Sequence, residues 1–243
     1  MVSTKFSGRA TAVATATLFL VTYSATGSAE VEQHEGMFSG VEVTYRVLLP
    51  DDFDANRTYP VVLHFAGGGQ TLGIVERSTE SDWRAHAEER GIVVISPAAP
   101  NGELFFAGGD RIFPAFIEHI LATYPAEGDK LHVVGHSNGG LSAFHIASLY
   151  PEHFISVTGY PGLIRGMSNT QAEAIAPLCV FMHVGDQDPG WLNPMRDQYR
   201  ALQERGLNIQ FFVEDDQTHR LDTSKDNLGM RLFAELEAAR NGC

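Results

Sequence analysis

A serine with glycines on both sides is the residue of this chain best suited to chemistry. Ser137 has one glycine two positions before it and another two positions after it. The apolar run 130–134 predicts a buried strand, and 141–149 predicts a helix. A serine on a sharp strand-to-helix turn is held clear of the sheet, so its hydroxyl can act as a nucleophile. The alternative is a glycine-rich turn with an incidental serine.

A serine hydroxyl is a weak nucleophile unless a base takes its proton and an acid orients that base. In an open parallel sheet, such groups meet at the carboxyl ends of the strands. His219 follows the last predicted strand and is therefore the predicted base. Asp188 follows the preceding strand and is the predicted acid, with Asp186 in the same loop as the alternative. The order Ser137, Asp188, His219 predicts a catalytic triad.

Acyl transfer also needs hydrogen-bond donors for the developing oxyanion. The backbone N–H of Asn138 is one candidate, because it lies at the positive end of the predicted helix. A second donor should come from the loop after strand 60–64, where glycines allow close approach of the backbone. Ala66 and Gly67 remain alternatives for this donor. No dinucleotide- or nucleotide-phosphate pattern is present in that loop.

Four ring-bearing residues near these loops are candidates for contacts with a substrate. Phe65 precedes the candidate oxyanion donors Ala66 and Gly67, and Trp191 follows the predicted acid, Asp188. Tyr160 begins a long connection, and His136 is adjacent to the serine. For Trp191, Tyr160 and His136, packing against the protein interior is the alternative.

Strands and helices alternate along the chain, which predicts an α/β fold with a mostly parallel sheet and helices on both faces. Strand 41–49 alternates polar and apolar residues, as a strand with one solvent-facing side does. The other predicted strands are 60–64, 92–96, 130–134, 154–158, 178–184 and 209–213, and the predicted helices are 81–90, 110–124, 141–149, 171–175, 194–205 and 228–239. No insertion is long enough to form a separate lid domain.

The first 29 residues have the pattern of a secretory signal peptide. Lys5 and Arg9 are followed by an apolar stretch, 10–21, and by small residues at 27–29. A membrane anchor is the alternative, but it needs about 20 apolar residues. We therefore predict one domain over 30–243, in a protein that is secreted or periplasmic and not bound to a membrane after removal of the signal.

Charge and cysteine content limit the partners. The net charge of −13 argues against nucleic acid and anionic membranes as partners. Cys179 and Cys243 are far apart in the sequence, and no histidine pair shares a helix face, so no metal site is predicted. Export permits a disulfide between the two cysteines, and free thiols are the alternative. The sequence leaves the oligomeric state open.

Segments 64–69 and 135–140, the motif Gly185-x-x-Asp188-Pro189 and His219 together resemble the α/β-hydrolase superfamily. Within it, the chain resembles secreted carboxylesterases without a lid, of the polyhydroxybutyrate-depolymerase, feruloyl-esterase or acetylxylan-esterase kind. The resemblance covers about residues 40–240. One departure is Phe65-Ala66, which separates His64 from Gly67 where such esterases usually have His-Gly.

The residues and the resemblance together predict an exported serine hydrolase that cleaves carboxylic esters through an acyl-enzyme. It needs no cofactor, and its substrate is an ester on a small molecule or a polymer. A peptidase similar to prolyl oligopeptidases is one alternative, although the extra domain that usually gates such enzymes is not visible. A non-catalytic binding protein on a hydrolase scaffold is another.

Overall fold

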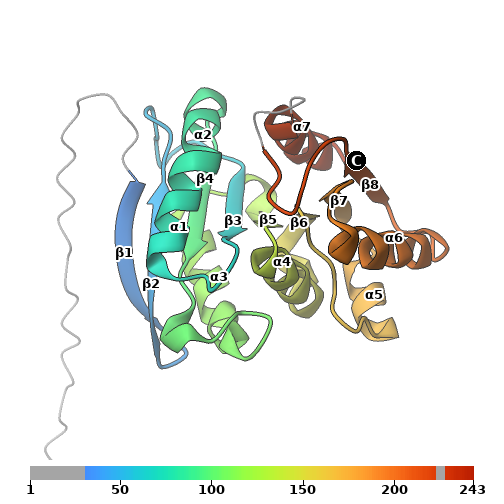
Figure 1. Cartoon of the computed structure of the whole chain (residues 1–243). Coiled ribbons are helices and arrows are strands. Elements are labelled where there is room, and N and C mark those ends of the chain that lie inside the picture. Colours follow the sequence, from blue (N-terminus) through green and yellow to red (C-terminus); the bar gives the residue numbers. More distant parts are fainter. Residues whose placement is uncertain (1–30, 223–227) are drawn as a thin grey trace, which may run out of the picture.

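An eight-stranded sheet forms the centre of the molecule in the computed structural model, which describes residues 31–222 and 228–243 (Figure 1). The spatial order of its strands is β1-β2-β4-β3-β5-β6-β7-β8. β1 and β2 run antiparallel to their neighbours, and the other pairs are parallel. The strands are β1 (Val31–Phe38), β2 (Val41–Leu48), β3 (Val61–Phe65), β4 (Val93–Pro97), β5 (Leu131–Gly135), β6 (Phe154–Gly159), β7 (Cys179–Gly185) and β8 (Ile209–Glu214).

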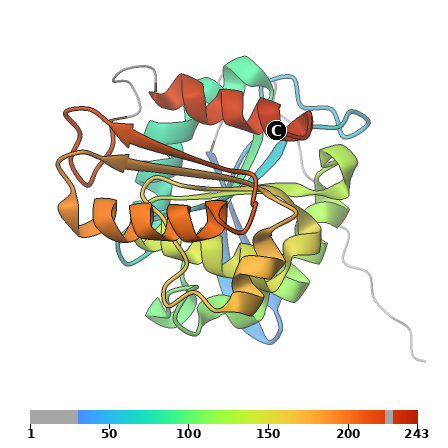
Figure 2. The same cartoon turned by 90° about the vertical axis from the view of Figure 1, so that its right-hand side faces the viewer.

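Helices cover both faces of the sheet, as the predicted α/β class requires (Figure 2). Helices α3 (Phe113–Thr123), α4 (Asn138–Leu149), α5 (Asn169–Ile175) and α6 (Pro189–Gln203) pack on one face. Helices α2 (Arg84–Arg90) and α7 (Leu228–Arg240) pack on the other. The central strands β3, β4, β5 and β7 are buried along their whole length, because side chains on both of their faces meet helices.

Two elements differ from the sequence prediction at the N-terminal side. β1 was not predicted, because it is a half-exposed edge strand with glutamate, glutamine and glycine among its residues. The predicted helix 81–90 is the end of a longer helical segment. That segment begins with α1 (Leu72–Ser78) and continues through a π-helical turn (Thr79–Trp83) into α2.

Helix α6 begins five residues earlier than predicted, directly after Asp188. Pro189 occupies its first turn, where the fixed φ of proline suits a helix and no N–H is needed. Pro194 lies inside the helix at an exposed position. The acid of the predicted triad is thus the residue that immediately precedes a helix, not a residue in the middle of a long loop.

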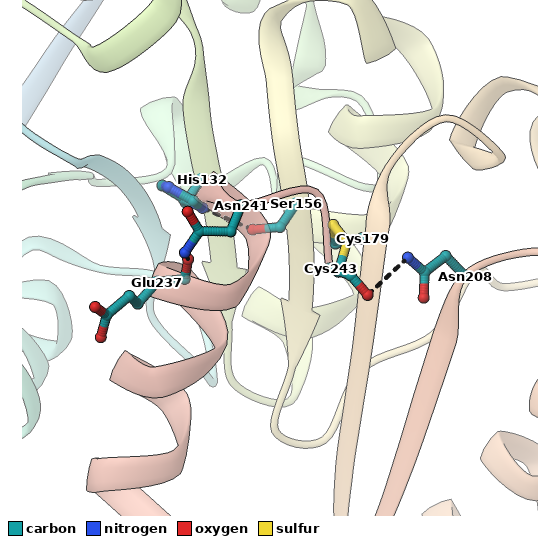
Figure 3. The surroundings of a disulfide bond; sticks show 7 residues. All are labelled: His132, Ser156, Cys179, Asn208, Glu237, Asn241 and Cys243. Carbon is teal, nitrogen blue, oxygen red and sulfur yellow. Dashed lines mark hydrogen bonds between the residues drawn. A yellow bond between two sulfur atoms is a disulfide. The ribbon is translucent and has the colours of Figure 1, made fainter.

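Cys179 and Cys243 form a disulfide, so the first of the two alternatives for these residues is confirmed (Figure 3). The bridge joins the first residue of β7 to the segment that follows α7. Asn208, just before β8, donates a hydrogen bond of 3.5 Å to the carbonyl of Cys243. The bridge therefore ties the terminal segment to the two strands at this edge of the sheet.

The predicted signal peptide lies outside the described residues. No helix in the described ranges is long and apolar enough to cross a membrane.

Candidate active site

Ser137 lies on a strained turn between β5 and α4. Its φ is 57° and its ψ is −118°, a conformation that costs on the order of 1–3 kcal/mol for a residue with a side chain. A Cβ on Gly135 would overlap the carbonyl of Gly139, and a Cβ on Gly139 would overlap the carbonyl of Phe65. The flanking glycines are thus required because the helix, the turn and the end of β3 pack backbone to backbone.

The structure brings Ser137, His219 and Asp188 together, although more than 80 residues separate the serine from the histidine. The distance from His219 Nε2 to Ser137 Oγ is 2.8 Å, and that from His219 Nδ1 to Asp188 Oδ2 is 2.7 Å. A carboxylate can only accept, so Nδ1 carries the proton and Nε2 is left to accept the serine hydroxyl. This is the tautomer that a general base needs.

The two candidate acids have different partners. Asp188 directs its carboxylate at the imidazole and is 12% exposed. Asp186 is exposed and instead accepts a 3.2 Å hydrogen bond from the backbone N–H of Gln217. Asp186 thereby shapes the loop that carries His219, whereas Asp188 alone of the two contacts the ring.

The two candidate oxyanion segments lie against each other. Asn138 is the first residue of α4, so its backbone N–H has no partner within the helix. Its side-chain amide donates a 2.8 Å hydrogen bond to the carbonyl of Gly68. This bond fixes the glycine loop, residues 67–69, beside the turn that carries Ser137. Ala66 is fully buried and Gly67 lies against His136. Ala66 and Gly67 thus both remain candidates for the second donor.

Of the four predicted substrate contacts, Phe65 is corrected by the structure. Its side chain has no exposed surface and packs in the interior against Phe105 and Phe113. The alternation of a strand explains this result, because Phe65 is the last residue of β3 and points to the face that α3 covers. Phe65 is a packing residue whose carbonyl, not its ring, contacts the serine turn.

Trp191 and Tyr160 contact different histidines. Trp191 is half-buried, and its ring centroid is 5.6 Å from that of His219, so it is placed beside the base. Tyr160 is only 2% exposed, and its ring packs against that of His136, with 5.6 Å between the ring centroids. Its hydroxyl is 3.3 Å from Nε2 of His64, and burial raises its pKa well above the ordinary value.

His136 contacts the backbone of His219. Its Nε2 is 3.3 Å from the carbonyl oxygen of His219, and the two ring centroids are 5.5 Å apart. Burial lowers the pKa of His136. The hydrogen bond to His219 O and the charge of Asp82 oppose this effect, and the charges of His219 and Arg220 add to it. The sequence indicated His136 as a candidate substrate contact next to the nucleophile, with packing as the alternative. No sequence signal indicated that it reaches the loop 83 residues away.

A cavity of about 940 Å³ borders this site. Gly67, Gly68, His136 and Tyr160 form the wall that it shares with the site, whereas Ser137 does not line it. No group of three or more potential metal ligands occurs among the described residues.

Two further histidines among the described residues, His64 and His183, are buried and lie within hydrogen-bond distance of neighbouring side chains. Nδ1 of His64 is 2.9 Å from Ser96 Oγ, and burial lowers the pKa of His64 to about 3. His183 lies between two buried glutamates, Glu214 at 2.9 Å and Glu235 at 2.8 Å. The sequence predicted structural roles for His64 and His183 but did not identify the two glutamates.

Solved structures with a similar fold are known. A ferulic acid esterase superimposes with a TM-score of 0.68 at 18% identity, covering 88% of this chain and 98% of its own. An S-formylglutathione hydrolase from Agrobacterium tumefaciens gives a TM-score of 0.65 at 19% identity, covering 85% and 94%. The chain has the α/β-hydrolase fold. The predicted fold class is therefore confirmed.

Curated relatives match this chain over part of their length. Feruloyl esterase B of Neurospora crassa is 26% identical over 188 residues, 68% of this chain and 60% of the relative. Acetylxylan esterase A of Talaromyces purpureogenus is 24% identical over 181 residues, 68% and 46%. Dipeptidyl-peptidase 5 of Porphyromonas gingivalis is 27% identical over 131 residues, 49% and 19%. The matches thus span 60% or less of these relatives. No family model matches the chain.

Proposed function

We propose that this α/β hydrolase is a serine carboxylesterase in which Ser137 is the nucleophile, His219 the general base and Asp188 the acid that orients it. The observation that carries this proposal is the continuous hydrogen-bond chain from Ser137 Oγ through the imidazole to Asp188, at 2.8 and 2.7 Å. A nucleophile must be close to its base, and the base to its orienting group.

In the proposed reaction, Ser137 Oγ attacks the ester carbonyl while His219 Nε2 takes its proton. The oxyanion accepts hydrogen bonds from the N–H of Asn138 and from one N–H of Ala66 or Gly67. The imidazolium then protonates the leaving alcohol, which leaves an acyl group on the serine. Water, activated by the same imidazole, releases the acid and restores Ser137.

An ester is the favoured substrate for two reasons. The feruloyl and acetylxylan esterases match 68% of this chain, against 49% for the dipeptidyl-peptidase. In addition, the site is open, since the His219 side chain is 44% exposed. Such access suits short acyl esters or esters carried on a polymer. Trp191, beside the base, is the proposed apolar contact for the substrate.

Export to an oxidising compartment is part of the proposal. Residues 1–29 have the signal-peptide pattern, and the mature domain would then be 30–243. The Cys179–Cys243 disulfide supports this destination, because disulfides persist mainly outside the reducing cytosol.

The decisive experiment is hydrolysis of p-nitrophenyl acetate, butyrate and octanoate, then of methyl ferulate and acetylated xylan, by residues 30–243. We expect activity on the short esters. Ser137→Ala should lower kcat/KM by at least about 1,000-fold. Ser39→Ala, which alters an exposed serine in the turn between β1 and β2, is the matched control and should keep full activity. Hydrolysis that survives in Ser137→Ala would contradict the proposal.

The dipeptidyl-peptidase relative supports a second candidate, a serine peptidase that uses the same residues. Dipeptidyl p-nitroanilides distinguish the two candidates. Turnover of these amides that exceeds turnover of every ester tested, and that is lost in Ser137→Ala, would assign the chain to the peptidases.

A further inference from the structure

His136 connects three parts of the site that are distant in the sequence. It directly precedes Ser137, its ring lies against Gly67 of the glycine loop, and its Nε2 reaches the carbonyl of His219 at 3.3 Å. The ring of Tyr160 packs against that of His136, with 5.6 Å between the ring centroids. The hydrogen bonds of Gln217 to Asp186 and Gln187 also hold the loop that carries His219.

The partners of His136 determine its protonation. A carbonyl can only accept, so Nε2 must carry the proton and donate it to His219 O. Nδ1 then faces Gly67, where an added Cβ would lie 2.6 Å from it, so a glycine is needed to make room for the ring. Burial lowers the pKa of His136, which keeps it neutral next to the base.

We propose that His136 is a positioning residue that holds the backbone of His219, and so sets the orientation of the base toward Ser137. The inference rests on the proposed role of His219 as base. During attack, His219 becomes a cation within 5.5 Å of the His136 ring, and a neutral donor at position 136 holds its backbone without charge repulsion. His136 contacts neither the substrate nor the reacting atoms in this mechanism.

Two amide variants form a matched pair that tests the position of the donor. In His136→Gln, the amide nitrogen can occupy the place of Nε2 and donate to His219 O. In His136→Asn, the amide is one carbon shorter and occupies the place of Nδ1 instead. We expect Asn to lower kcat for p-nitrophenyl acetate about five- to tenfold with KM changed less than twofold, because the loss of one hydrogen bond is of this size. Gln should recover most of the activity.

A third variant, combined with removal of the base, separates positioning from simple packing. His136→Phe keeps a ring but has no donor, and alone it should lower kcat about tenfold. In a His219→Ala background it should change the residual rate less than twofold, because there is no base left to position. A packing role that acts through the glycine loop would lower the residual rate further, since the oxyanion donors still operate in that background.

The outcomes distinguish the two proposals. If His219→Ala leaves ester hydrolysis intact, the proposed mechanism is wrong. If His219→Ala abolishes most activity but Asn and Gln at position 136 behave alike, only the positioning role is overturned. If His136→Phe does not fold, the amide pair still decides, since both members are polar, uncharged and differ by one methylene group.

Discussion

Acid is expected to destabilise this fold through a buried histidine in its central strand. His132, on β5, has 1% of its surface exposed, and its Nδ1 is 2.8 Å from Ser156 Oγ (Figure 3). Burial and the charge of Arg240 lower the pKa of His132 to about 4. An unfolded histidine has a pKa of about 6.5, so below that pH the unfolded chain binds a proton that the folded protein excludes.

The sign and the size of the effect follow from this difference. The neutral histidine contributes no pH dependence above pH 6.5, and stability is lost as the pH falls from 6.5 toward 4. Between pH 7 and pH 5 the loss from His132 alone is about 2 kcal/mol, and near pH 5 close to one proton is bound on unfolding. This is a large fraction of the roughly 5–15 kcal/mol by which folded proteins are stable.

His132→Asn tests the calculation, because the amide can replace Nδ1 as partner of Ser156 but does not titrate. Urea unfolding of both proteins at pH 7, 6 and 5 gives the free energy of unfolding at each pH. The value for the variant minus that for the wild type should increase by about 2 kcal/mol from pH 7 to pH 5, whatever its starting value. A difference that stays constant over this range would refute the reasoning. The m-values of the variant and the wild type should be equal at each pH, which checks that both proteins unfold in the same way.

Three further outcomes are expected. Gly139→Ala should abolish esterase activity or folding, because its Cβ would overlap backbone oxygen atoms, whereas Gly190→Ala should be neutral, since its Cβ meets nothing nearer than 3.7 Å. Replacing Cys179 and Cys243 together by serine should lower the free energy of unfolding by about 4 kcal/mol in denaturant titrations, from the entropy of the loop that the bridge closes. Burial lowers the pKa of His183, but Glu214 and Glu235 together raise it above its ordinary value. The free energy of unfolding should therefore fall as the pH rises above 6.5 through the pKa of the folded protein. Urea midpoints at pH 6, 7.5 and 9 measure this change, and midpoints that rise over this range would contradict it.

The fold and the local geometry of the serine turn were predictable, because both depend on short-range sequence patterns. Apolar runs bounded by turns indicate buried strands, and glycines at 135 and 139 indicate close backbone packing around Ser137. β1 was missed because its sequence is polar and its partner, β2, supplies the pairing that stabilises it. The start of α6 was missed because Pro194 suggested a later first turn than Pro189 provides.

Contacts between distant segments could not be predicted in the same way. Phe65 was expected at the substrate, but which face of β3 it occupies depends on the packing of α3, and this places its ring in the interior. The choice between Asp186 and Asp188 likewise depends on how two loops meet. Sequence order and residue type narrowed each choice to a few positions, and only the tertiary arrangement distinguishes among them.

A buried group around His183 links the two strands that precede the loops of Asp188 and His219. His183 lies on β7, two residues before the strand ends, and Glu214 is the last residue of β8. Their 2.9 Å contact joins the two strands near the ends from which the loops continue, and Glu235 links His183 to α7. A shift of β7 past β8 would break the contact between His183 and Glu214 and leave buried polar groups unpaired. Asp188 follows β7 and His219 follows β8, so the contact of His183 with Glu214 lies where the two loops begin that bring Asp188 and His219 to 2.7 Å from each other.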